Sequence, residues 1–216
     1  VYTSSVAAYG YHLDNPVPLT EHTLPRGSIE HYYSEQKAVC ETVLAEVTDG
    51  TALEVFVLRP CMVAGPKATA VADAMPWNRL PAKVRSVTAA VPLLKVVCPD
   101  PGIPLQLVHH DDVADAIALA ATTSAAAGAY NIAADGEITL TDIANALGAR
   151  PVKVPAAAAT IASAVVARLP FLPSALEWLH FGKTSIVMDT KKAKAELGWK
   201  PRYTSAETLE SLAASL

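Results

Sequence analysis

The sequence "YYSEQKAVCETVLAEVTDGTALEVFVLRP", residues 32–60, contains a helix signal followed directly by a strand signal. We expect a helix that starts near Ser28 or Ile29 and reaches about Thr48, because the Asp-Gly pair that follows is typical of a helix C-terminus. The apolar, β-branched run "LEVFVLRP" then predicts a buried strand that Pro60 stops. A helix, a short turn and a strand in this order are typical of an α/β protein.

Strand and helix signals continue to alternate along the chain. The opening "VYTSS" indicates the end of a strand, whereas "CMVAGP" indicates a loop. "PLQLVHHDDVADAIALAATT" predicts a short strand, a polar corner and a helix, and "AYNIA" predicts another strand. Further helix signals lie in residues 67–91 (interrupted by prolines), 139–148, 155–170, 174–182, 189–201 and the C-terminal tail. The alternation predicts an α/β fold with a parallel sheet.

Capping residues mark two of the expected helix starts. Asp111 or Asp112 is suited to cap the helix after the polar corner, and Thr139 or Thr141 the helix after "AYNIA". Gly148 is expected to end the second of these helices.

The polar corner raises the alternative of a metal site, because His109, His110, Asp111 and Asp112 are all metal-ligating residue types. Adjacent side chains of a strand point to opposite faces, so these side chains are not expected to converge. We interpret the corner as a strand end and a helix cap, and predict no metal.

Composition excludes several classes of function. Of the 216 residues, 51% are hydrophobic and 18% are charged, and the net charge is −4, so no basic face for nucleic acid is evident. Cys40, Cys61 and Cys98 are odd in number and far apart, which favours free thiols in a reducing compartment. The apolar segment between Pro155 and Pro170 is too short to span a bilayer. We expect a cytoplasmic protein with no membrane or nucleic-acid partner.

Tyr33 and Lys37 are four residues apart, so they share one face of the expected helix. This spacing arises by chance in many helices, and the simplest interpretation is a surface pair. The alternative is a tyrosine whose phenolate form is favoured by a neighbouring cation, as a proton-transferring residue requires. The spacing alone does not decide between them.

Six motifs in a fixed order carry a resemblance that covers nearly the whole chain. They are "VYTSSVAAYG", "YYSEQK", "LRPCMVAGP", "LVHHDDVADAIALA", "GAYNIAADGEITLTDIANALG" and "KAELGWKP". This series resembles the extended short-chain dehydrogenase/reductase family of NAD-dependent epimerases, dehydratases and reductases. The resemblance implies the C-terminal part of a Rossmann-like parallel sheet with a smaller substrate-binding domain. On this basis, residues 1–66 are the remnant of a dinucleotide-binding domain with the catalytic helix. Residues 67–216 complete the sheet and form the substrate-binding subdomain.

The resemblance also implies roles for individual residues. Ser5, Tyr33 and Lys37 match the catalytic set, and Tyr33 and Lys37 also contact the cofactor, NAD or NADP. Residues 60–63, from Pro60 to Val63, match the loop whose backbone lies against the nicotinamide. The implied activity is an oxidoreductase or epimerase that acts on a secondary alcohol, ketone or sugar.

The largest departure from the family is a missing motif. The family opens with a strand, a glycine-rich turn and a helix that bind the pyrophosphate, and this chain has no G-x-x-G-x-x-G. Roughly the first 110 residues expected of the doubly wound fold are absent, so we expect a truncated chain or a fragment that is inactive alone. Within the family, the alternative to an enzyme is a non-catalytic dinucleotide-sensing or scaffold protein.

Substrate and assembly are also expectations from the resemblance. Sugar-nucleotide members usually have Asn at the position of Met62 and Arg near the position of Leu105, so a less polar substrate such as a ketone, aldehyde or sterol-like compound is expected. The apolar segment 156–181 supports this, unless its side chains only pack the small domain. In many members of this family the helix that matches residues 29–48 forms a dimer interface, so the resemblance implies a homodimer.

Overall fold

A computed structural model of the chain describes residues 1–79, 81, 95–155 and 184–216. It confirms an α/β protein, in which every pair of named strands in the described residues is parallel. The strands are β1 (Tyr2–Thr3), β2 (Phe56–Pro60), β3 (Met62–Ala64), β4 (Val97–Asp100), β5 (Leu107–His109), β6 (Gly128–Ile132) and β7 (Arg150–Lys153). The helices are η1 (Val6–Tyr9), α1 (Tyr32–Thr48), α2 (Ala70–Ala74), η2 (Pro76–Arg79), α4 (His110–Thr122), α5 (Leu140–Ala146), α8 (Lys191–Glu196) and α9 (Ser205–Ala213).

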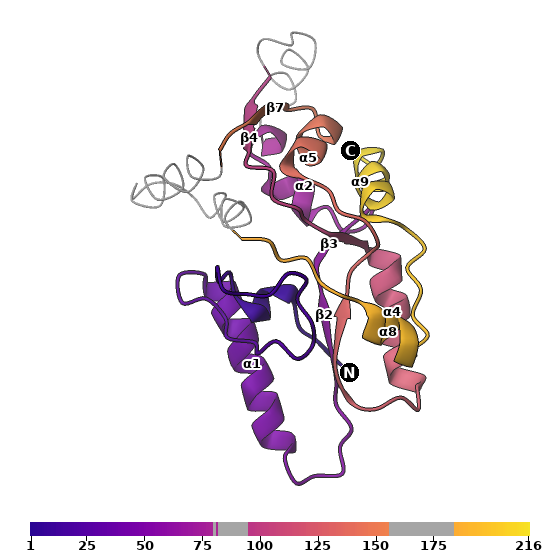
Figure 1. Ribbon diagram of the computed structural model, residues 1–216. Helices are drawn as coiled ribbons and strands as arrows, with labels where there is room; N and C mark the ends of the chain where they lie inside the picture. The colour runs from indigo at the N-terminus through magenta and orange to yellow at the C-terminus, as the bar shows by residue number, and fades with distance from the viewer. Residues whose placement is uncertain (80, 82–94, 156–183) are drawn as a thin grey trace.

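The main sheet has the strand order β1-β2-β6. Helix α1 lies on one side of it, and α4 and α8 lie on the other (Figure 1). Leu58 of β2 pairs with Tyr130 of β6, and both side chains are fully buried in a core that includes Ile132 and Trp199. Apolar residues on both faces are what a parallel sheet covered by helices requires.

A second core lies beyond the carboxyl end of β2, where the two-stranded sheets β3-β5 and β4-β7 meet α2, α5 and α9 (Figure 1). Leu107, Ile143 and Leu212 are buried there. Because β6 belongs to the main sheet, residues 67–216 contribute to both cores, and the division into 1–66 and 67–216 stays a prediction. Among the described residues, every helix is too short or too polar to cross a bilayer.

Two expectations about element boundaries were wrong. Residues 61–66 are not all loop, because β3 pairs with β5 through Val63 and Val108. The partner strand is more than forty residues away in sequence, so a local pattern could not reveal it. Helix α1 begins at Tyr32 rather than near Ser28, because the Ser28 hydroxyl accepts a hydrogen bond from the Tyr11 amide at 2.8 Å and does not cap the helix.

The cap of α4 also differs from the expectation. His109 is the N-cap, and its Nδ1 accepts the Asp111 amide. Asp112 is instead fully buried, and its carboxylate accepts hydrogen bonds from the backbone amides of Arg202 and Tyr203 at 3.0 and 3.2 Å. The choice of Thr139 as the N-cap of α5 is confirmed by a capping box. Two further helices were expected, in residues 155–170 and 174–182. Except for Pro155, these residues lie outside the described part of the chain.

A buried ion pair joins α1 to the main sheet. The Glu41 carboxylate accepts from Arg59 Nη2 at 2.6 Å and from Arg59 Nε at 3.1 and 3.2 Å, and both side chains are only 6% exposed. Arg59 Nη1 also donates to the Tyr9 hydroxyl at 2.9 Å, which in turn donates to Asn131 Oδ1 at 2.6 Å. Burial of two charges is tolerated only when both are fully paired, and here every group has partners.

Removing one member of this pair is expected to be costly. Arg59→Met leaves Glu41 buried without its cation, so the free energy of unfolding should fall by about 3–5 kcal/mol. The double variant Arg59→Met/Glu41→Leu removes both charges and should recover much of that loss. Urea denaturation measures both values. A loss below about 1 kcal/mol in Arg59→Met would contradict the importance of the pair.

Candidate active site

Tyr33 and Lys37 share one face of α1, as their spacing predicts. The Lys37 ammonium lies 5.8 Å from the centre of the Tyr33 ring, and Tyr33 is 48% exposed. Lys37 Nζ also donates a hydrogen bond to the Thr3 carbonyl oxygen at 3.0 Å. The ammonium is therefore held between α1 and the end of β1, with the Tyr33 ring open to solvent beside it.

The segment of residues 3–7 continues from this contact along the face of α1. The Ser4 amide donates to the Leu58 carbonyl at 2.7 Å, which keeps the segment on the sheet. Ser5 is the N-cap of η1, and its hydroxyl accepts from the Ala7 amide at 3.2 Å. The Ser34 hydroxyl, next to Tyr33, donates to the Ala7 carbonyl at 2.6 Å. Residues before and after Ser5 thus contact α1, through the Thr3 and Ala7 carbonyls.

Pro60 is the last residue of β2, one strand away from β1. Because β1, β2 and β6 are parallel, the segment after Thr3 and residues 60–63 leave the sheet at the same edge. Ligands of open α/β sheets bind at this carboxyl edge. Val63 already belongs to β3, where it pairs with Val108. Ser5 and Pro60 thus follow neighbouring strands at one edge, and Lys37 contacts this edge through Thr3, while the roles of these residues stay predictions.

Tyr2 is a site neighbour that the sequence did not single out. Its ring centre lies 5.2 Å from Lys37 Nζ. Burial raises the pKa of Tyr2 to about 12, aided by a hydrogen bond with Cys40 and nearby negative charge. Tyr2 therefore stays protonated at neutral pH and is not suited to act as a base. The Lys37 ammonium lies near two phenol rings, those of Tyr2 and Tyr33, and only Tyr33 is a candidate for proton transfer. No local motif indicates this contact, since it joins β1 to α1.

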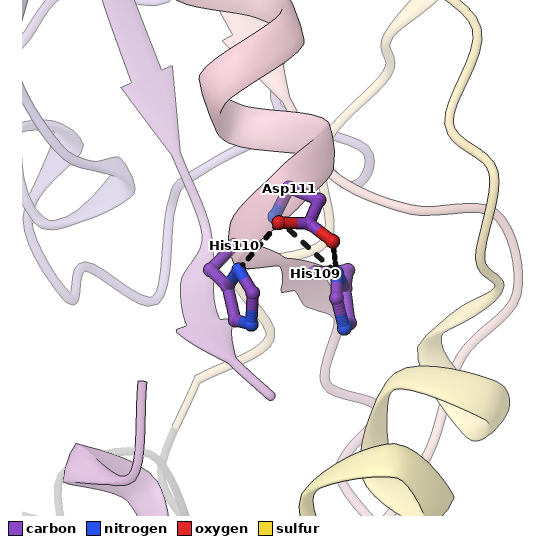
Figure 2. A group of neighbouring side chains, drawn as sticks. All are labelled: His109, His110 and Asp111. Carbon is purple, nitrogen blue, oxygen red and sulfur yellow. Dashed lines mark hydrogen bonds and ion pairs between the residues drawn. The ribbon is translucent and has the colours of Figure 1, made fainter. Parts of the chain in front are cut away.

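The polar corner at the start of α4 brings His109, His110 and Asp111 together (Figure 2). His110 Nδ1 lies 2.9 Å from an Asp111 oxygen, and His109 Nδ1 lies 3.7 Å from the other. The expectation that these side chains do not converge was wrong. His109 ends β5 and His110 begins α4, so the alternation of a strand does not continue across the pair. The interpretation as a strand end and helix cap is confirmed.

The contacts of His109 favour a structural role for this corner. Its Nδ1 accepts the Asp111 amide, and its ring stacks on Tyr203 with centres 4.0 Å apart. Burial, followed by the charge of His110, lowers the pKa of His109 and favours its neutral form. A cation here would also face the positive end of α4. The absence of a metal stays a prediction.

Leu105 bears on the expected apolar substrate. It is 1% exposed, and its backbone exchanges two hydrogen bonds with Ile138, at 2.8 and 2.9 Å. Leu105 therefore packs the second core, which by itself explains an apolar residue there. Met62 is half-buried at the start of β3. The whole apolar segment 156–181 lies outside the described residues.

The three cysteines are free thiols with different surroundings. Cys61 follows Pro60 and is buried, and burial raises its pKa far above the ordinary value. Burial also raises the pKa of Cys98 to about 11. Cys40 is exposed on α1. A thiolate is the reactive form of cysteine, so burial disfavours reaction of Cys61 although it lies within residues 60–63, the segment expected to face the cofactor.

The structure defines a class of protein: an α/β fold with a tyrosine–lysine pair near the carboxyl edge of a parallel sheet. Comparison with known families narrows it, because the family described as NAD dependent epimerase/dehydratase matches residues 1–133. The chain belongs to this family.

The individual proteins and structures that this chain resembles have low sequence identity to it. An uncharacterized protein of Sinorhizobium fredii, y4nG, is 28% identical over 97% of this chain and 50% of its own length. RMD from Pseudomonas aeruginosa, solved with NADPH, has 17% identity and a TM-score of 0.64, with 99% of this chain matched to 65% of that one. UDP-glucuronic acid 4-epimerase from Bacillus cereus, solved with NAD, has 15% identity and a TM-score of 0.66, matched over 99% and 59%. These structures show the fold, and the chain spans about half the length of the y4nG protein.

Thiol reactivity tests the burial of the cysteines. In the native protein, Ellman's reagent should titrate one rapidly reacting thiol, because Cys40 is exposed while Cys61 and Cys98 are buried. All three should react in guanidinium chloride. Cys40→Ser should abolish the rapid phase without changing the two slow thiols. A rapid phase that persists in this variant would mean that a buried cysteine is accessible.

Proposed function

We propose that the whole protein transfers a hydride between NAD or NADP and a secondary alcohol or ketone, which includes oxidation or epimerisation of a sugar. The observation that carries the proposal is the Lys37 ammonium, 5.8 Å from the half-exposed Tyr33 ring in a chain of this family. The hydride chemistry is supplied by the nicotinamide when it is bound.

In the proposed mechanism Tyr33 moves the proton. Its hydroxyl takes the proton of the substrate alcohol during oxidation, or returns one to the substrate oxygen during reduction. Lys37 favours the phenolate form of Tyr33 by its charge. The Ser5 hydroxyl holds the same substrate oxygen by a hydrogen bond, for which it must be released from the Ala7 amide or shared with it.

The described residues suit one end of the dinucleotide cofactor better than the other. Lys37 uses one of its three N–H donors on Thr3, so two remain for the hydroxyls of a nicotinamide ribose. Pro60 and Val63 are the residues proposed to face the nicotinamide. A pyrophosphate needs a glycine-rich turn at a helix N-terminus, and this sequence contains no such turn. The residues present therefore suit the nicotinamide end of the cofactor.

The alternative is a dinucleotide-sensing or scaffold protein of the same fold. Retention of Ser5, Tyr33 and Lys37 favours the enzyme, because a sensor needs the ribose contact of Lys37 but no hydroxyl on Tyr33. A less polar ketone, aldehyde or sterol-like compound remains our proposal for the substrate, on the basis of Met62.

A second copy of the chain is the proposed partner. Val39, Val43 and Val47 follow one another at four-residue intervals on α1, and 48%, 48% and 66% of their respective surfaces are exposed. This apolar row suits the packing of α1 against another helix. A cytoplasmic location is proposed as well, consistent with three free thiols.

Substitution of Tyr33 is the direct test of the proposed function. In the whole protein, Tyr33→Phe removes only the hydroxyl, so turnover should fall by roughly 10²–10⁴ while folding and cofactor binding change little. With a panel of ketones, sterols and sugar nucleotides, oxidation or reduction is followed by NAD(P)H absorbance, and epimerisation, which causes no net change in NAD(P)H, by analysis of the sugar product. Tyr32→Phe is the matched control, since Tyr32 is 75% exposed and should leave the rate unchanged. Full activity in Tyr33→Phe would exclude this mechanism.

Cofactor titration tests the division of the binding site. The 216-residue chain should give little change in NADH fluorescence at micromolar NADH, because the pyrophosphate has no glycine-rich turn to bind. A longer protein that supplies a strand, a glycine-rich turn and a helix before Val1 should bind NADH. Its Lys37→Met variant should bind more weakly, because a ribose contact is lost. Tight binding by the 216-residue chain would show that another part of this sequence receives the pyrophosphate.

A further inference from the structure

Glu41 lies on the same row of α1 as the proposed catalytic pair. Tyr33, Lys37 and Glu41 follow at intervals of four residues, and such residues face the same side of a helix. The row passes from half-exposed at Tyr33 to buried at Glu41. Glu41 is two turns from Tyr33, so it is not expected to contact a substrate there.

The Glu41 carboxylate joins α1 to the segment that carries Ser5. The Ser4 hydroxyl donates to Glu41 Oε1 at 2.5 Å, and Ser4 is 3% exposed. On its other side the carboxylate binds Arg59 of β2 through both Nη2 and Nε. Because the Arg59 guanidinium binds the Glu41 carboxylate at more than one nitrogen, the carboxylate has little freedom to move. Its hydrogen bond from Ser4 is also stronger than one between two neutral groups, because the acceptor is charged.

Three hydrogen bonds therefore connect α1 to residues 3–7. They are Lys37 Nζ to the Thr3 carbonyl, Ser4 Oγ to Glu41, and Ser34 Oγ to the Ala7 carbonyl. Ser5 lies between the second and third of them. The Ser4 contact is the one of the three made by the residue directly before Ser5, and its acceptor on α1 is itself bonded to β2 through Arg59.

We propose that Glu41, acting through Ser4, is a positioning residue that fixes the placement of the Ser5 hydroxyl relative to Tyr33. This inference rests on the proposed function. The Glu41–Arg59 pair is the fixed element, and the Ser4 hydroxyl transmits its position to the next residue. Without that hydroxyl, the Ser4 amide still holds the segment to Leu58 of β2, but residue 4 loses its contact with α1, so that Ser5 can shift relative to Tyr33. A shift of about 1 Å in a reacting group is enough to lower a rate by up to about 10²-fold.

Ser4→Ala in the whole protein tests the proposal, because it removes the Ser4 hydroxyl and leaves the Glu41–Arg59 pair intact. We expect kcat to fall about 10-fold or more, while KM and NADH affinity change less than about twofold. Ser4→Thr keeps a hydroxyl and should restore most of kcat.

Ser205→Ala is the matched control. It also removes a buried serine hydroxyl, which donates to the Gly136 carbonyl at 2.9 Å in the second core. Its melting temperature should fall by an amount similar to that of Ser4→Ala, with kcat unchanged. If Ser4→Ala does not fold, Ser4→Thr and Ser4→Cys are compared, and the weak thiol donor should give the lower kcat.

The outcomes separate the two proposals. Normal kcat in Ser4→Ala, or a loss that Ser205→Ala reproduces, overturns the positioning role while Tyr33→Phe still reports on the proposed function. If Ser4→Ala does not fold, equal kcat values in Ser4→Thr and Ser4→Cys overturn the positioning role. A parent that binds NADH and turns over no substrate of the panel overturns both proposals.

Discussion

The buried pair of Glu41 and Arg59 is the interaction on which the arrangement of this fold depends. It joins α1 to the central strand β2, and Arg59 extends the connection through Tyr9 to Asn131 of β6. Asn131 Nδ2 then donates to the backbone carbonyls of Leu19 and Asp189. Helix, sheet and two distant loops thus meet in one network. A network of this kind is stabilising only when every polar group in it is satisfied, so its members must be placed together.

The nature of the buried face of α1 explains why directional bonds matter here. The buried residues of α1 are Ser34, Ala38 and Glu41, none of which is a large apolar residue. Apolar packing is not directional and tolerates small shifts, whereas a charge-assisted hydrogen bond is weakened by them. A helix held mainly by such bonds is fixed in rotation and in height above its sheet. That is a suitable support for a tyrosine and a lysine that must face the end of β1.

Local signals were sufficient for much of the fold. Gly50, with a φ of 68°, follows the end of α1 where the sequence predicted it, and the Thr139 cap and the strand β6 were also recognised. The Tyr33–Lys37 face follows from helix geometry alone. Pairings between distant segments were not predictable: β3 with β5, and β4 with β7, depend on partners that a single stretch does not reveal. The contacts of Glu41 with Ser4 and of Tyr2 with Lys37 were missed for the same reason.

The buried carboxylate of Asp112 has a consequence for the order in which the chain folds during synthesis. Its partners are the amides of Arg202 and Tyr203, and its own carbonyl accepts from Trp199 Nε1 at 2.8 Å, all from residues about ninety positions later. Domains fold as their residues emerge from the ribosome, N-terminal parts first. Until residues 199–203 have been synthesised, the Asp112 carboxylate in the first turn of α4 lacks these partners, and water must solvate its charge. Because burying this charge without its partners is unfavourable, the final docking of α4 onto β2 depends on the presence of residues 199–203.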